Sequence, residues 1–270
     1  MFEIFSSVDT WIALLTLTFL EIILGIDNIV FISLAANKLP KHQQKKATNL
    51  GLLMAMVQRI FLLFGISFLV ELKRPFYTIH NSWLDISISS QSLILFFGGL
   101  FLLYKSTSEI HIKLDTPYQE ENTLNSKKIT SLKNAIVQIL IIDFIFSIDS
   151  ILTAVGMTNG IGNSPNDALI LMIIAVIISI IVMIFFANTI RNFINRNPSI
   201  QMLALSFLIL IGFMLITEAA HLSNTVIFGN KVGAIPKGYL YFAIAFSLIV
   251  EFLNMKLKKK IETSEKNNKR

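Results

Sequence analysis

The chain has 270 residues, of which 54% are hydrophobic and only 15% charged, and its mean hydropathy is +0.67. Because a soluble domain carries about 25% charged residues, this composition predicts an integral membrane protein and excludes a disordered chain. The absence of cysteine excludes disulfides, thiolate metal sites and cysteine nucleophiles, and the net charge of +6 does not indicate nucleic-acid binding, since the basic residues lie between apolar segments and form no nucleic-acid motif.

Seven apolar segments approach the length that a helix needs to cross a bilayer. In chain order they are Trp11–Ala36, Asn49–Val70, Gln91–Tyr104, Asn134–Thr158, Ala168–Thr189, Gln201–Ala220 and Tyr239–Met255. The third and the seventh are short, so we expect these helices to extend into their flanks. The first is expected to be a true span and not a cleaved signal peptide, because residues 1–10 carry acids and no basic residue. The predicted fold class is all-α, a polytopic membrane protein with seven transmembrane helices.

The loops of the chain differ in their content of lysine and arginine. Most of the 23 basic residues follow the first, third and fifth segments or lie in the tail after the seventh. The opposite side carries Lys73, Arg74, Lys231 and Lys237. Because cytoplasmic loops carry the excess of basic residues, we expect the N-terminus outside and the C-terminus in the cytoplasm.

A motif in the first segment returns in the fourth. The strings EIILGIDNIV (21–30) and DFIFSIDSIL (143–152) align without gaps. The alignment matches Glu21 with Asp143, Gly25 with Ser147, Asp27 with Asp149, and Asn28 with Ser150. A weaker match is the six-residue spacing from Gly99 to Lys105 and from Gly212 to Glu218. Because the first and fourth segments cross in opposite directions, the motif predicts a 3+3 inverted repeat, with the seventh helix outside it.

This interpretation divides the chain into five parts. Residues 1–110 form the first three-helix repeat, 111–133 a cytoplasmic connector, 134–222 the second repeat, 223–255 the outer loop with the seventh helix, and 256–270 a basic cytoplasmic tail. The connector mixes acids and bases, so a flexible link is expected. The tail is expected to contact anionic lipid head groups.

Carboxylates lie inside the apolar segments at Glu21, Asp27, Asp143, Asp149, Glu218 and Glu251. An acid at mid-membrane costs roughly 2.5–3.5 kcal/mol on insertion scales, so such residues indicate functional sites. Arg59 is the basic residue clearly within the same zone, with Lys105 near an edge. Because one or two cations cannot neutralise all these carboxylates, some of the acids must be protonated, solvated by a cavity or bound to a metal.

The other donors near these acids are oxygen atoms, from the amide of Asn28 and the hydroxyls of Ser150 and Thr153. Oxygen donors suit hard divalent cations, so Mn²⁺, Mg²⁺ or Ca²⁺ is the expected ion, and no organic cofactor is expected. Histidine contributes little, since only His221 lies near a span, on the same helical face as Glu218.

The spacing within each motif raises the question of a broken helix. Glu21 and Asp27 are six residues apart, which places them about 120° apart around a regular helix. We therefore hypothesise that the first helix unwinds near Gly25 and the fourth near Ser147, which would free backbone carbonyls as ligands. Asp27 would then lie toward the cytoplasm and Asp149 toward the outside.

Each assignment has a plainer alternative. The acids of the repeat would form a structural ion pair with Arg59, or serve as protonated hydrogen-bonding groups. Glu218 and His221 would form an interfacial polar pair. Glu251 would lie at the inner membrane interface.

Several segments resemble one family. EIILGIDNIVFISLAANKLP, LGLLMAMVQRIFLL, DFIFSIDSILTAVGMT and LIGFMLITEAAH are similar to segments of the TerC family of integral membrane proteins, which is associated by name with tellurium resistance. The resemblance is to the short, seven-span bacterial form, and it implies the cell inner membrane, kinship with LysE-type exporters and manganese export. It also implies that the metal ligands are Glu21, Asp27, Asp143 and Asp149, with Asn28 and Ser150 as neighbours.

The residues and the resemblance together favour a secondary transporter that exports a divalent cation, Mn²⁺ first, and returns protons on the same acids. Its partners would be the lipid bilayer, the metal ion and protons, with a homodimer or a translocon contact as further options and no nucleic acid. An alternative is an accessory membrane protein that metalates secreted or membrane enzymes or scaffolds a tellurium-resistance complex. An intramembrane aspartyl protease is not favoured, because both aspartates follow isoleucine and the protease motifs are missing from the sequence, so no enzyme activity is expected.

Overall fold

The computed structural model describes Phe5 and residues 7–37, 39–81, 83–115, 131–158 and 165–268. Its helices are α1 (Val8–Ala36), α2 (Lys41–Phe64), α3 (Ile66–Glu71), α4 (Ser90–Asp115), α5 (Leu132–Thr158), α6 (Pro165–Arg196), α7 (Pro198–Leu222) and α8 (Lys237–Asn268). Within the described residues, six of these helices, α2 and α4 to α8, are long and apolar enough to cross a membrane. The all-α membrane fold is therefore confirmed. The helix α1 covers the first predicted segment. That it also crosses the membrane, as the seventh such helix, stays a prediction.

Local sequence signals set several helix ends. The hydroxyl of Ser7 caps α1 by accepting a hydrogen bond from the backbone N–H of Thr10 at 3.2 Å. Proline opens α7 at its first position, where the missing N–H costs nothing. The second predicted segment is two helices, because α2 ends at Phe64 and α3 begins at Ile66, with Gly65 between them. The short third and seventh segments extend as expected, α4 to Asp115 and α8 through most of the basic tail.

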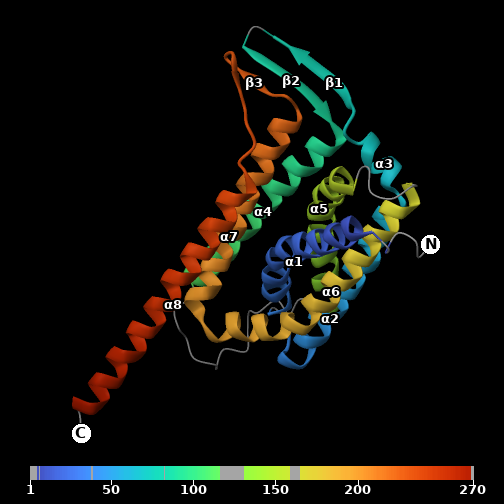
Figure 1. Cartoon of the computed structure of the whole chain (residues 1–270). Coiled ribbons are helices and arrows are strands. Elements are labelled where there is room, and N and C mark those ends of the chain that lie inside the picture. Colours follow the sequence, from blue (N-terminus) through green and yellow to red (C-terminus); the bar gives the residue numbers. More distant parts are fainter. Residues whose placement is uncertain are drawn as a thin grey trace.

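A small sheet, which the sequence analysis did not predict, lies at one end of the helices (Figure 1). Its strands are β1 (Pro75–His80), β2 (Leu84–Ser89), β3 (Val226–Ile227) and β4 (Asn230–Lys231), antiparallel and in the order β1-β2-β3-β4. The backbone N–H of Ser87 also donates to the carbonyl of Ser223 at 2.7 Å, and that of Phe228 donates to the carbonyl of Trp83 at 2.9 Å. The sheet thus joins the segment before α4 to the segment after α7. Of the predicted connector, residues 116–130 lie outside the described residues.

The helices α4 and α7 lie side by side and cross at two glycines (Figure 1). A Cβ atom added at Gly99 would lie 2.6 Å from the carbonyl oxygen of Gly212, and one added at Gly212 would lie 2.9 Å from that of Gly99. The predicted repeat matches these two glycines with each other. A reciprocal contact is what a twofold relation between two halves produces, so it supports the repeat, which itself stays a prediction.

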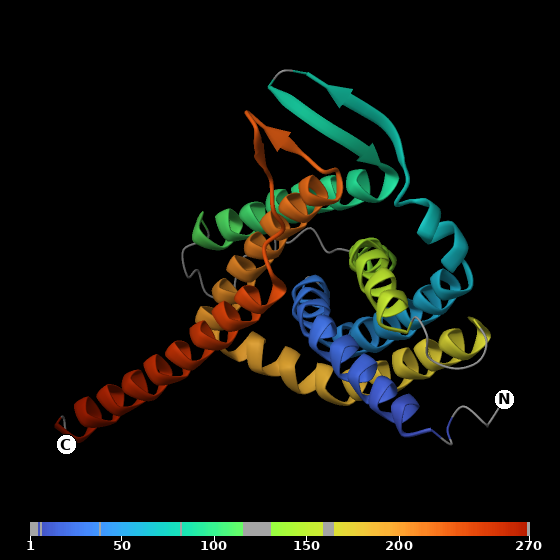
Figure 2. The same ribbon diagram turned by 45° about the horizontal axis from the view of Figure 1, so that its top comes forward.

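The remaining long helices α1, α2, α5 and α6 pack on one another (Figure 2), with α1 against α6 and α2 against α5. In the predicted repeat α1 corresponds to α5 and α2 to α6, so exchanging the two halves turns the α1–α6 pair into the α5–α2 pair. The helix α8 lies against α7, and few of its side chains are buried. The fold therefore has an α4–α7 pair, carrying the sheet and α8, beside a bundle of four helices.

Candidate functional site

Two acids matched by the repeat meet on one arginine. Arg59 of α2 donates from Nη1 to Glu21 Oε2 of α1 at 2.5 Å, and from Nη2 to Asp143 Oδ1 of α5 at 2.6 Å. Its Nε also lies 3.2 Å from both carboxylate oxygens of Asp143. The three residues are only 2%, 3% and 4% exposed, in the order Arg59, Glu21 and Asp143.

Arg59, Glu21 and Asp143 form the Arg59 centre, and a neighbouring hydroxyl also donates a hydrogen bond to it. The hydroxyl of Ser147, one turn along α5, donates to Asp143 Oδ2 at 3.2 Å. The ion pair with Arg59, the plainer alternative for the repeat acids, is therefore present for Glu21 and Asp143. With both carboxylates ionised, one guanidinium leaves the centre with one formal negative charge. A role of these two acids as metal ligands stays a prediction.

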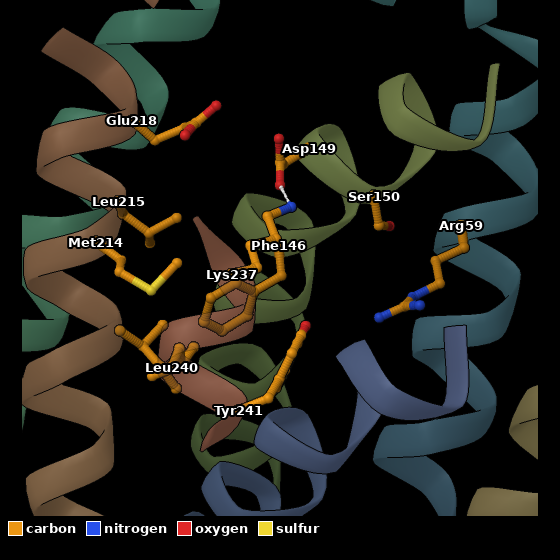
Figure 3. A pocket seen from close by; sticks show the side chains of 11 residues that line it. Arg59, Phe146, Asp149, Ser150, Met214, Leu215, Glu218, Lys237, Leu240 and Tyr241 are labelled. Atoms are coloured by element: carbon orange, nitrogen blue, oxygen red, sulfur yellow. Dashed lines mark hydrogen bonds and ion pairs between the residues drawn. The ribbon is translucent and has the colours of Figure 1, made fainter. Parts of the chain in front are cut away.

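A second set of charged groups lines a pocket between α5, α7 and the start of α8 (Figure 3). The ammonium group of Lys237 pairs with Asp149 Oδ2, and the carboxylate of Glu218 lies on the facing wall. The pocket holds about 610 Å³ of space, part of it open, and its walls are otherwise mainly apolar. In the part of the chain that the structure describes, Glu218 has no hydrogen bond or ion pair. We call this pocket the outer pocket because Asp149 is predicted to lie toward the outside, and it contains a carboxylate with no direct partner among the described residues.

Lys237 was not predicted as a site residue. Its sequence position placed it only among the basic residues of the side opposite the tail. Two signals were available: Lys237 directly precedes the last apolar segment, in IPKGYLY, and Asp149 was expected at the same end of the membrane. The structure confirms that these two residues lie together.

The outer pocket connects both charged sets, since Arg59 and Ser150 also line it (Figure 3). No cluster of three or more Asp, Glu, His or Cys side chains that could hold a metal occurs among the described residues. The pocket does offer two facing carboxylates, and a divalent cation accepts such ligands together with hydroxyl oxygens and water. For Asp27 and Asn28 the structure describes the backbone, within α1, and their side chains lie outside the described residues.

The other candidates are not all brought to these sites. Thr153 donates to the backbone carbonyl of Asp149 at 2.9 Å, within its own helix. Glu218 and His221 share α7, and within the described residues no hydrogen bond or ion pair joins them, so the polar pair stays a prediction. Glu251 lies about 21 Å further along α8 than Lys237, at 1.5 Å per residue.

Lys105 lines a different, smaller pocket between the α4–α7 pair and the bundle, which we call the inner pocket. Its ammonium group lies 3.3 Å from the carboxylate of Glu109, one turn along α4. Leu205 of α7 also lines this pocket, about 20 Å along the helix axis from Glu218 in the outer pocket. The two pockets therefore follow one another along α7, the inner one beside Leu205 and Leu208 and the outer one beside Ile211 to Glu218.

The hypothesis that the helices unwind at the motifs is wrong, because α1 and α5 are helical throughout. The physical reason differs between the two positions. At Gly25 an added Cβ would lie 2.2 Å from Met183 Sδ of α6, so the glycine permits close helix packing. At Ser147 the hydroxyl donates to the carboxylate of Asp143, one turn earlier on the same helix, so the serine bonds within α5 and frees no backbone carbonyl.

Replacing Gly25 with alanine should destabilise the protein by about 1 kcal/mol, since the new methyl group pushes a flexible methionine side chain aside. Unfolding in detergent would measure the loss. In a Met183→Ala background the same substitution should cost measurably less, because the opposing atoms are gone. An equal cost in both backgrounds would mean that the contact with Met183 is not the cause.

Comparisons with known proteins agree on one group. The sequence profile described as "Integral membrane protein TerC family" matches residues 6–267. The chain is 44% identical over 260 residues to the UPF0053 inner membrane protein YgdQ of Escherichia coli (strain K12), covering 96% of this chain and 98% of YgdQ. It is 39% identical over 259 residues to a UPF0053 protein of Haemophilus influenzae, covering 96% and 99% of the two chains. The UPF0053 inner membrane protein YoaE of Escherichia coli (strain K12) is 41% identical over 252 residues, 93% of this chain but 44% of YoaE. No solved structure matches the chain.

Proposed function

Because the chain belongs to the TerC family of integral membrane proteins, we propose that it is a secondary transporter of the bacterial inner membrane that exports a divalent metal cation, with Mn²⁺ as the first candidate. The names of the relatives YgdQ and YoaE support the inner membrane. The N-terminus would lie outside and the C-terminus in the cytoplasm, as the distribution of basic residues predicts.

The observation that carries this proposal is the charge balance around the outer pocket. Among the described side chains of the two charged sets, four carboxylates face two cations, which leaves two formal negative charges when all are ionised. The carboxylates are Glu21, Asp143, Asp149 and Glu218, and the cations are Arg59 and Lys237. Uncompensated charge is costly at membrane depth, and a bound divalent cation would offset it. Protons on the same acids would offset it as well, which is the basis for exchange of the metal against protons.

Metal flux into proteoliposomes under an imposed proton gradient tests the proposal. We expect wild-type protein to move Mn²⁺, and Asp149→Asn and Glu218→Gln to lower the initial rate by about tenfold or more, since a lost charged ligand costs at least about 1.4 kcal/mol. A matched control is Glu71→Gln, which removes an exposed carboxylate that pairs with Arg74 at 3.6 Å.

Two results would count against the transporter. Wild-type protein that binds a divalent cation but moves no Mn²⁺, Mg²⁺ or Ca²⁺ would favour the accessory role in metalation or in a tellurium-resistance complex. Flux that is unchanged by both substitutions in the outer pocket would place the transported ion elsewhere.

A further inference from the structure

We propose that the ammonium group of Lys237 is a built-in competitor of the transported cation. It occupies the carboxylate of Asp149 when the outer pocket is empty, and the cation displaces it on binding. This inference rests on the transport function proposed above and adds to it the group that substitutes for the cargo when the transporter is empty.

The exposure of the ion pair is the first support. The side chains of Lys237 and Asp149 are 36% and 18% exposed, whereas those of Arg59 and Glu21 are 3% and 4%. A partly exposed ion pair contributes little net stability and exchanges more readily than a fully buried pair. Of the ion pairs formed by Arg59 and by Lys237, the pair of Lys237 with Asp149 is therefore the one that an arriving ion can replace.

The charges of the pocket are the second support. Lys237 neutralises one of the two facing carboxylates, and Glu218 is left without a direct partner among the described residues. A divalent cation between Asp149 and Glu218 would neutralise both. The cation can contact both acids directly, whereas Lys237 pairs directly with Asp149 and acts on Glu218 only at longer range. The cation therefore prevails when it is present, and Lys237 returns when it leaves.

The attachment of Lys237 to the fold is the third support. It is the first residue of α8, a helix that packs on α7 and has few buried side chains. Residues 232–236, just before it, form neither helix nor strand, and an added Cβ at Gly233 would meet no atom within 4 Å. Lys237 can thus withdraw from the pocket without disturbing the packing of the four-helix bundle.

Removal of the charge gives opposite effects on binding and on transport. Lys237→Met should bind Mn²⁺ about tenfold more tightly than wild type, because the competing charge is gone. Its maximal rate of Mn²⁺ export should nevertheless fall about tenfold, because the empty transporter lacks the counter-ion with which it resets. Lys237→Arg should keep both values within about threefold of wild type.

The experiment pairs equilibrium Mn²⁺ binding with flux for wild type, Lys237→Met and Lys237→Arg, with Lys231→Met as the control for loss of an exposed lysine nearby. If Lys237→Met transported Mn²⁺ at the wild-type rate and bound it no more tightly than wild type, the inference would be overturned and the transport function would stand. Wild-type protein with neither binding nor flux would overturn both.

A second measurement needs no substitution at Lys237. Hydrogen exchange of the amides of residues 232–241 in wild-type protein should be faster with saturating Mn²⁺ than without it, because displacement of the ammonium group loosens the start of α8. Unchanged or slower exchange with Mn²⁺ bound would overturn the inference even if Lys237→Met failed to fold.

Discussion

Replacing Arg59 with methionine should lower the free energy of unfolding by about 3–5 kcal/mol, because it leaves two buried carboxylates without their partner. Both Glu21 and Asp143 are almost fully buried and each lies within 2.6 Å of the guanidinium. Denaturant unfolding of the purified protein in detergent, followed by tryptophan fluorescence, would measure the change.

Two further variants separate the loss of charge from the loss of packing. Arg196→Met removes an exposed arginine at the end of α6 and should change stability by no more than about 0.5 kcal/mol. Adding Glu21→Gln and Asp143→Asn to Arg59→Met should recover part of the loss, since neutral amides cost less to bury than unpaired carboxylates. A single Arg59→Met variant as stable as wild type would show that these acids are not held as ionised carboxylates.

Replacing Gly99 with valine should disrupt the crossing of α4 and α7. The atoms opposite Gly99 include the carbonyl oxygen of Gly212 and the backbone nitrogen of Ile216, which cannot rotate away as a side chain can. Overpacking typically costs about 1–3 kcal/mol, and we expect valine to reach the upper end of that range and alanine the lower end. Thermal unfolding in detergent would rank wild type, Gly99→Ala and Gly99→Val.

The matched control for this substitution is Gly156→Ala on α5. An added Cβ at Gly156 meets no atom within 4 Å, so alanine there should be neutral or should stabilise the helix by up to about 1 kcal/mol. A Gly99→Val protein with wild-type stability would mean that the two helices do not approach each other closely at Gly212.

The positions of the long helices follow from the length of the apolar segments, because a bilayer leaves few other structures for such a chain. The Arg59 centre could be anticipated only in part, since Arg59 is the basic residue deepest in the apolar segments but six carboxylates lie in the same zone. The sequence could not decide between an unwound helix and a close helix crossing at Gly25, because glycine serves both purposes.

The contacts of Lys237 and Glu218 were harder to predict for a physical reason. Spacing along one helix gives the faces of that helix, but which face meets another helix depends on rotations that only packing fixes. The pairing of Lys237 with Asp149 depends on how α8 lies against α7. The sheet was missed because its strands are short and lie in loops, although residues 84–89 alternate apolar and polar side chains.

The joining of α4 and α7 at two levels has a mechanical consequence. The crossing of Gly99 with Gly212 holds the pair near its middle, and the sheet ties the end where α4 begins and α7 ends, so moving one helix relative to the other would break one of these contacts. The pair is therefore expected to move as one unit, a lever. The outer and inner pockets are lined by neighbouring stretches of α7, so tilting the lever against the four-helix bundle would change the width of both pockets together. The sliding surface would then cut through each of the predicted repeats, taking one helix from each, and would not run along the boundary between them.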